Sequence, residues 1–96
     1  MKFCFLSAAE AELFEAAAYY EIQSQKLGEN FLEIIETAVT EIVASPKTWP
    51  EIGNGIHRRL IRRFPYSILY GIYDNEVVVG AIMHQKQKPR YWAERL

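Results

Sequence analysis

The feature that most constrains the fold is an apolar stripe with a helical period between residues 30 and 44. Apolar side chains recur every three or four residues, with glutamate and threonine between them, which predicts a helix that buries one face. The helix should begin near Glu29 or Asn30 and end at Ser45-Pro46, because proline disfavours a helical conformation in the residue before it. The stripe consists of Phe31, Ile34, Ile35, Ala38, Val39, Ile42 and Val43.

A second helix should precede this one. Residues 8–27 are rich in alanine, glutamate, leucine and glutamine, which are strong helix formers. Ser7 and Glu10 have the spacing of a capping box, and Gly28 is expected to end the helix as its C′ residue. A connection this short makes the two helices an antiparallel hairpin. Two helices alone bury only each other, so a sheet must cover their remaining apolar faces.

Short runs of aromatic and β-branched residues predict the strands of that sheet. Asp74-Asn75 suits a two-residue hairpin turn between the last two strands. Residues 47–55 are rich in proline and glycine and are expected to form a loop, with Trp49 packing beneath it as a core residue. The expected strands are Lys2–Leu6, His57–Phe64, Tyr66–Tyr73 and Glu76–His84, followed by a short helix near Pro89–Leu96.

The order of these elements predicts one α+β domain over residues 1–96, with a two-layer β-α-α-β-β-β topology. If the first strand runs up, the helices run down and up, and the last three strands run down, up and down. The first strand is then antiparallel to the fourth, which gives an antiparallel sheet of order 1-4-3-2 with the helical hairpin on one face. The run of three valines at 77–79 should make the fourth strand central, and the second strand should lie at an edge.

Charge is divided unequally along the chain, although the net charge is only −1. Residues 1–56 carry nine glutamates against three lysines, while residues 57–96 carry eight basic residues against three acidic ones. The second part is therefore suited to attract an anionic partner. Two other interpretations stay open: the two parts neutralise each other by packing, or the arginines protect a sheet edge from aggregation. Four of the cations fall within six residues, at Arg58, Arg59, Arg62 and Arg63.

Several classes of site are not expected. The single cysteine, Cys4, leaves no intramolecular disulfide and fits a reducing, cytoplasmic setting. The two histidines, His57 and His84, lack neighbours at the spacing of metal ligands, and no glycine-rich phosphate loop is present, so we expect no metal and no cofactor. No apolar run approaches the roughly 18 residues of a membrane span, and we expect neither membrane insertion nor a signal peptide.

Four segments together resemble a known family. They are Phe-Leu-Glu-Ile-Ile in the second helix, Ser-Pro-Lys-Thr-Trp-Pro in the loop, Arg-Arg-Phe-Pro-Tyr-Ser-Ile-Leu-Tyr at the centre, and Met-His-Gln-Lys-Gln-Lys-Pro-Arg-Tyr-Trp-Ala-Glu-Arg near the end. The chain resembles the RelE/ParE toxin superfamily of bacterial type II toxin–antitoxin systems, and is most similar to its ParE-like, plasmid-stabilisation branch. The resemblance covers nearly the whole chain.

The resemblance implies one of two activities. ParE-like members bind a protein target, DNA gyrase, and cut no nucleic acid, whereas RelE-like members are endoribonucleases that cleave messenger RNA on the ribosome. The ribonuclease branch commonly has arginines where this chain has Ser67 and, just after the fourth strand, Gln87. Arg58 matches a basic position of that branch. The candidates for RNA cleavage are His84, Arg90 and Tyr91, although a lone histidine at a strand end is more often structural.

A toxin of this superfamily is neutralised by a cognate antitoxin, which lays an extended or helical segment over the hairpin and the sheet. Antitoxin tails are often acidic, so the basic half is the expected contact surface, in a hetero-oligomer of toxin and antitoxin. The favoured hypothesis is a ParE-like toxin that is not an enzyme. The alternatives are the ribonuclease and an inactive member that retains only antitoxin binding. The residues expected to bind antitoxin or target are Arg58, Arg59, Arg62, Arg63, Lys86, Lys88 and Arg90.

Overall fold

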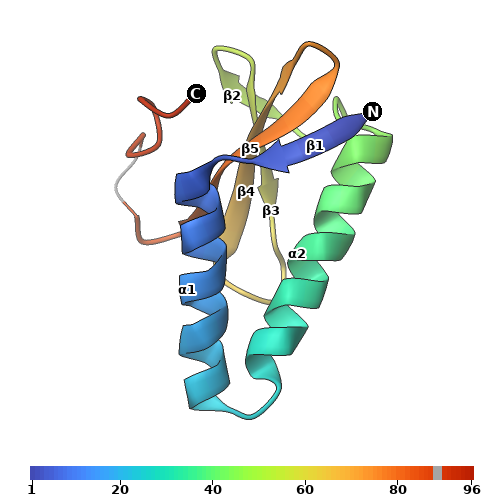
Figure 1. Ribbon diagram of the computed structural model, residues 1–96. Coiled ribbons are helices and arrows are strands. Elements are labelled where there is room, and N and C mark those ends of the chain that lie inside the picture. Colours follow the sequence, from blue (N-terminus) through green and yellow to red (C-terminus); the bar gives the residue numbers. More distant parts are fainter. Residues whose placement is uncertain (88–89) are drawn as a thin grey trace.

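The computed structural model describes residues 1–87 and 90–96. A short strand precedes two helices, and the remaining strands follow them, which confirms the predicted α+β fold (Figure 1). The sheet lies against one side of the helical hairpin, and the segment after the last strand lies apart from α2. The elements are β1 (Lys2–Phe5), α1 (Ser7–Gln23), α2 (Leu27–Ala44), β2 (Glu51–Gly53), β3 (Ile56–Leu60), β4 (Tyr66–Tyr73) and β5 (Glu76–His84).

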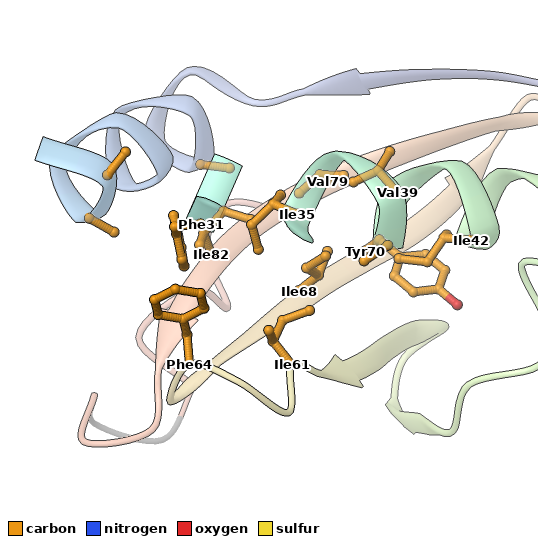
Figure 2. Close-up of a cluster of buried hydrophobic side chains, with 14 of the residues drawn as sticks. Phe31, Ile35, Val39, Ile42, Ile61, Phe64, Ile68, Tyr70, Val79 and Ile82 are labelled. Atoms are coloured by element: carbon orange, nitrogen blue, oxygen red, sulfur yellow. The ribbon is translucent and has the colours of Figure 1, made fainter. Parts of the chain in front are cut away.

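The apolar stripe of α2 forms the centre of the core. Phe31, Ile35 and Ile42 are each at most 1% exposed, because they pack onto side chains of β4 and β5 (Figure 2). Phe31 also makes an edge-to-face contact with Phe64, with ring centroids 5.1 Å apart. The period of the sequence therefore predicted both the helix and its buried face correctly. The sheet side of this core includes Ile61, Ile68, Tyr70, Val77, Val79 and Ile82.

The connection between the helices differs from the expectation in its details. α1 ends at Gln23, and Gly28 lies in the first turn of α2 with its backbone close to α1. Lys26, with φ 69°, adopts the left-handed conformation that was expected of the glycine. The Glu21 carboxylate accepts the backbone N–H groups of Lys26 and Gly28 at 2.9 and 3.0 Å and so caps α2 from the neighbouring helix.

The expected capping box at the start of α1 was also wrong. Leu6 is the N-cap residue and Ser7 is the first residue of the helix, and no side chain caps the helix at Leu6. The chain leaves β1 directly into the helix, and the Leu6 N–H continues the strand pairing by donating to the Val79 carbonyl at 2.9 Å. Ser7 is therefore one position too late to act as a cap.

The sheet has five strands in the order β1-β5-β4-β3-β2, and β1 is parallel to β5. The predicted order was right for the four expected strands, and β5 is an interior strand with a neighbour on each side, but the prediction of a fully antiparallel sheet was wrong. The reason is the short strand β2, which lies in the segment expected to be a loop. It pairs antiparallel with β3 and adds one reversal of direction, so β5 runs parallel to β1.

The last two strands have the predicted bounds, and their hairpin turn is confirmed. Asp74 and Asn75 have φ values of 50° and 60°, as a type I′ turn requires. In contrast, β3 ends at Leu60, four residues before the predicted end. The chain must reverse before β4 begins at Tyr66, and the Ile61 N–H donates to the Tyr66 carbonyl at 2.9 Å to close this turn. A strand extending to Phe64 would leave no residues for the reversal.

The segment after β5 packs on the face of the sheet that the helices leave open. Trp92 is 6% exposed and packs with Ile56, Leu69 and Ala81. A short helix was predicted near Pro89–Leu96, but residues 90–96 form successive hydrogen-bonded turns instead. Pro89 lies outside the described residues. Leu96 occupies the space above Gly80, where any side chain on residue 80 would collide with it.

The close approach of the two helices predicts that Gly28→Ala destabilises the protein. A Cβ at this position would overlap the carbonyl oxygen of Ala17, a backbone atom that cannot move independently of α1. We expect a loss of about 1–3 kcal/mol in the free energy of unfolding, measured by urea denaturation. Glu29→Ala, at the next and exposed position, is the control and should change stability by less than about 0.5 kcal/mol. Equal stability of both variants would contradict the predicted collision.

Candidate functional site

The arginine run does not form a single surface, because successive residues of β3 point to opposite faces of the sheet. Arg59 points toward the helices, where its guanidinium donates to the Ala38 carbonyl of α2 at 3.2 Å. Arg58 points to the other face, and its Nε donates to the Ser67 hydroxyl at 3.1 Å. Arg62 and Arg63 follow the strand and are exposed. The four arginines of the run, all expected to bind a partner, therefore occupy three different environments.

Arg59 is the most strongly held of these residues. Its guanidinium lies 2.6 Å from a carboxylate oxygen of Glu41 and 4.4 Å from the centroid of the Trp49 ring. Its side chain is only 18% exposed, against 52% for Glu41. Trp49 packs against the core, as expected, and also provides the aromatic face on which the guanidinium rests.

A groove of about 780 Å³ runs between α2 and the edge of β3. Its floor is apolar, with Ile34, Ala38 and Ile61, and the exposed Arg62 and Arg63 form part of its rim. We call it the arginine groove. Its lining consists of Glu33, Ile34, Thr37, Ala38 and Glu41 from α2, Trp49 and Pro50 from the loop, and Arg58–Arg63.

Part of the β3 edge beside this groove is open. Strand β2 pairs with the start of β3 only, and the Arg58 N–H donates to the Pro50 carbonyl at 2.9 Å. Because backbone groups alternate along a strand, the N–H and C=O of Leu60 point to the same edge as the Arg58 N–H. Among the described strands, none pairs with Leu60 on that side, and its side chain is 63% exposed. The expectation that the arginine strand forms an edge is thus confirmed only for its last residues.

The cations and candidate catalytic residues near the end of the chain form a second, separate group. His84, Lys86, Gln87 and Tyr91 line a shallow hollow of about 400 Å³. The Nδ1 atom of His84 accepts the Lys86 backbone N–H at 3.0 Å, and its ring meets Tyr66 edge to face, with centroids 5.0 Å apart. One nitrogen of His84 therefore stabilises the turn after β5.

Tyr91 is held by a carboxylate rather than free to transfer a proton. Its hydroxyl donates to Glu12 at 2.7 Å, and burial together with this carboxylate raises the pKa of Tyr91 far above its ordinary value. Glu12 also accepts the Ile82 backbone N–H at 3.1 Å and forms an ion pair with Arg95 at 2.8 Å. The pKa of Arg95 is raised as well, chiefly by its hydrogen bond to Glu12. The cluster attaches the last segment to α1 and β5.

Arg90 does not line this hollow. Arg90 is exposed, and its guanidinium lies 5.7 Å from the centroid of the Trp92 ring. Lys88 lies outside the described residues.

Over residues 1–87 and 90–96, no group of three His, Cys, Asp or Glu side chains could hold a metal ion. No helix in the same part of the chain has the length and apolar character needed to span a membrane.

Sequence reasoning missed the partners of the predicted residues. Glu41 is one of the glutamates between the apolar positions of α2, and nothing in the sequence singles out Glu12 in α1. No short-range pattern marks either of them, because Glu41 lies 18 positions before Arg59, and Glu12 lies 83 positions before Arg95. The resemblance did single out Ser67, which is 1% exposed and accepts the Arg58 hydrogen bond.

The Glu12 cluster predicts a specific loss of stability. Glu12→Gln keeps the shape of the side chain but removes the charge shared by Arg95 and Tyr91, so we expect a loss of about 1–3 kcal/mol in urea denaturation. Glu15→Gln, at an exposed position of the same helix, is the matched control and should be nearly neutral. Similar curves for the two variants would show that the cluster does not hold the last segment.

Both the sequence and the fold are similar to those of known proteins. A family model described as "ParE toxin of type II toxin-antitoxin system, parDE" matches residues 5–89. Among curated proteins, no sequence matches. Nine solved chains match, one of which comes from the chromosomal ParDE TA system of P. aeruginosa. That chain superposes with a TM-score of 0.63 at 17% identity, over 88% of this chain and 95% of its own length, and therefore shares the fold.

Proposed function

The chain belongs to the ParE toxin family of type II toxin–antitoxin systems, and we propose that it acts in the cytoplasm by binding a protein target such as DNA gyrase. We further propose that a cognate antitoxin neutralises it by placing an acidic segment in the arginine groove, in a hetero-oligomer of the two proteins. The observation that carries the proposal is the groove itself, which combines an apolar floor, exposed arginines and an open strand edge.

Each part of the groove suits a peptide segment. The open backbone groups of Leu60 can pair with an added strand, a common way for a folded domain to bind an extended peptide. The floor of Ile34 and Ala38 can accept an apolar side chain. Arg62 and Arg63 stand at the rim, where carboxylates of the segment can reach them from solvent. The charges favour an acidic segment over a neutral or basic one.

The contacts around the candidate catalytic residues favour target binding over RNA cleavage. Cleavage at a 2′-hydroxyl needs a base, an acid and cations beside the reacting phosphate. Tyr91 is bonded to Glu12, and its raised pKa opposes loss of its proton. One nitrogen of His84 already accepts a backbone N–H. Position 67, where the ribonuclease branch commonly has arginine, is a buried serine bonded to Arg58.

The proposed target is tested by induced expression together with purified components. We expect growth arrest with DNA breaks and, in vitro, inhibition of gyrase supercoiling by the purified chain. Cellular messages should stay intact in primer extension, because the Tyr91 hydroxyl is held by Glu12 and one nitrogen of His84 already accepts a backbone N–H. Cuts within translated codons would instead support the ribonuclease alternative. Harmless expression in several hosts would indicate an inactive member that retains antitoxin binding.

The proposed antitoxin site is tested by charge removal at the groove rim. Arg62→Gln with Arg63→Gln should weaken binding of the antitoxin, expressed from the neighbouring reading frame, by roughly tenfold or more at low salt. The slope of log affinity against log salt should become shallower, because fewer ionic contacts are left to screen. Lys2→Gln with Lys26→Gln, two exposed cations outside the groove, is the matched control. Equal affinity of both double variants would rule out the groove as the antitoxin site.

A further inference from the structure

The arginine groove contains a carboxylate of its own at the place where a partner's carboxylate would bind. Glu41 lies 2.6 Å from the Arg59 guanidinium. Glu41 and Arg59 both line the groove. The rim cations Arg62 and Arg63 follow the strand and are open to solvent. In the free protein, the cation nearest the floor of the groove is thus already neutralised.

Arg59 keeps its position without depending on Glu41 alone. The Ala38 carbonyl accepts one of its N–H groups at 3.2 Å, and the Trp49 ring supports its guanidinium at 4.4 Å. These two contacts come from α2 and from the loop before β2, so they fix the direction of the guanidinium independently of the Glu41 side chain. Loss of the Glu41 charge should therefore leave Arg59 in place with an unpaired positive charge.

Glu41, by contrast, is held weakly. Its side chain is 52% exposed on the surface of α2, and its one ion pair is with Arg59 among the described residues. An ion pair with an exposed carboxylate contributes little net free energy to stability, because water solvates the carboxylate well when the two groups separate. A second carboxylate at the same guanidinium would meet like-charge repulsion from Glu41. Exchange of one carboxylate for another at Arg59 is therefore inexpensive, whereas simultaneous occupation is not.

We propose that Glu41 is a specificity-determining residue that competes with the carboxylates of an incoming segment for Arg59. The inference rests on the proposed role of the groove as the antitoxin site. A segment with few acidic residues forms ionic contacts only with the rim arginines, because Arg59 stays paired with Glu41. A segment that places a carboxylate against the floor displaces Glu41 and gains a partly buried, charge-assisted contact. The internal carboxylate thereby raises the discrimination between strongly and weakly acidic segments.

The experiment uses the purified chain and a synthetic probe, so that it is independent of growth arrest and of gyrase. The probe is a fluorescent ten-residue peptide of alternating glutamate and leucine, and the same peptide with glutamine in place of glutamate is the uncharged reference. Binding is measured by fluorescence anisotropy at low salt. The variants are Glu41→Gln, Arg59→Gln and the double variant, which together form a double-mutant cycle. Glu33→Gln, which removes a charge from the same groove lining, is the matched control.

We expect Glu41→Gln to tighten binding of the acidic probe by roughly threefold to tenfold, as for one gained charge-assisted contact, and to leave the uncharged reference unchanged. In the Arg59→Gln background the same substitution should have no such effect. Glu33→Gln should produce a smaller gain that does not depend on Arg59. Thermal unfolding of each variant checks that the fold is intact, and Arg59→Met, which keeps an apolar stem without the charge, replaces Arg59→Gln if the latter unfolds.

Three results would overturn the inference. Weaker binding after Glu41→Gln would mean that Glu41 only positions Arg59 or contacts the partner itself. If Glu41→Gln tightened probe binding equally with and without Arg59, or no more than Glu33→Gln does, the effect would come only from the lower negative charge of the groove. Absence of probe binding by both wild type and Glu41→Gln would remove the groove as an acceptor of acidic segments. None of these results bears on the gyrase test. If the chain proves harmless on expression but the variants bind the probe as expected, the groove has this selectivity even though the chain is not toxic.

Discussion

The packing of α2 on the sheet is the interaction on which the remaining structure depends. Phe31, Ile35 and Ile42 are buried against β4 and β5, so this contact fixes the position of α2 relative to the sheet. It also sets the width of the gap between α2 and the shorter strand β3. The arginine groove is that gap, and its acidic and basic walls come from the two elements that the core holds apart. The shape of the arginine groove is therefore a direct product of how the core packs.

Strand alternation then decides what each arginine can do. Arg58 and Arg59 are neighbours in the sequence, yet one bonds to a buried serine on the open face and the other to α2. A cluster that looks like one cationic patch in the sequence is divided into a structural arginine, a neutralised groove arginine and two exposed rim arginines. Only the last two are available to a partner without a rearrangement. The density of charge in a sequence thus overstates the charge that a partner meets.

The limits of sequence reasoning follow from the range of the interactions involved. Local patterns placed α2, β4, β5 and the Asp74-Asn75 turn, because each depends on a period or on a turn residue. β2 escaped notice because Glu51–Gly53 is too short to show a period and lies among prolines and glycines. That one omission reversed the expected pairing of β1. At the site, residue types predicted the arginines, but their partners Glu41 and Ser67 depend on pairing across the fold.

Position 67 shows how the same pairing bears on function. In the β3–β4 register Leu60 lies opposite Ser67, and Arg58 is diagonal to it on the same face, so its guanidinium reaches the Ser67 hydroxyl. An arginine at position 67 would place a second cation beside Arg58 on a residue that is now 1% exposed, and desolvation and like-charge repulsion would both oppose it. A small hydroxyl there accepts the Arg58 hydrogen bond without adding a charge. The residue that departs from the ribonuclease pattern thus links β4 to β3, next to the strand edge at which we propose the antitoxin segment pairs.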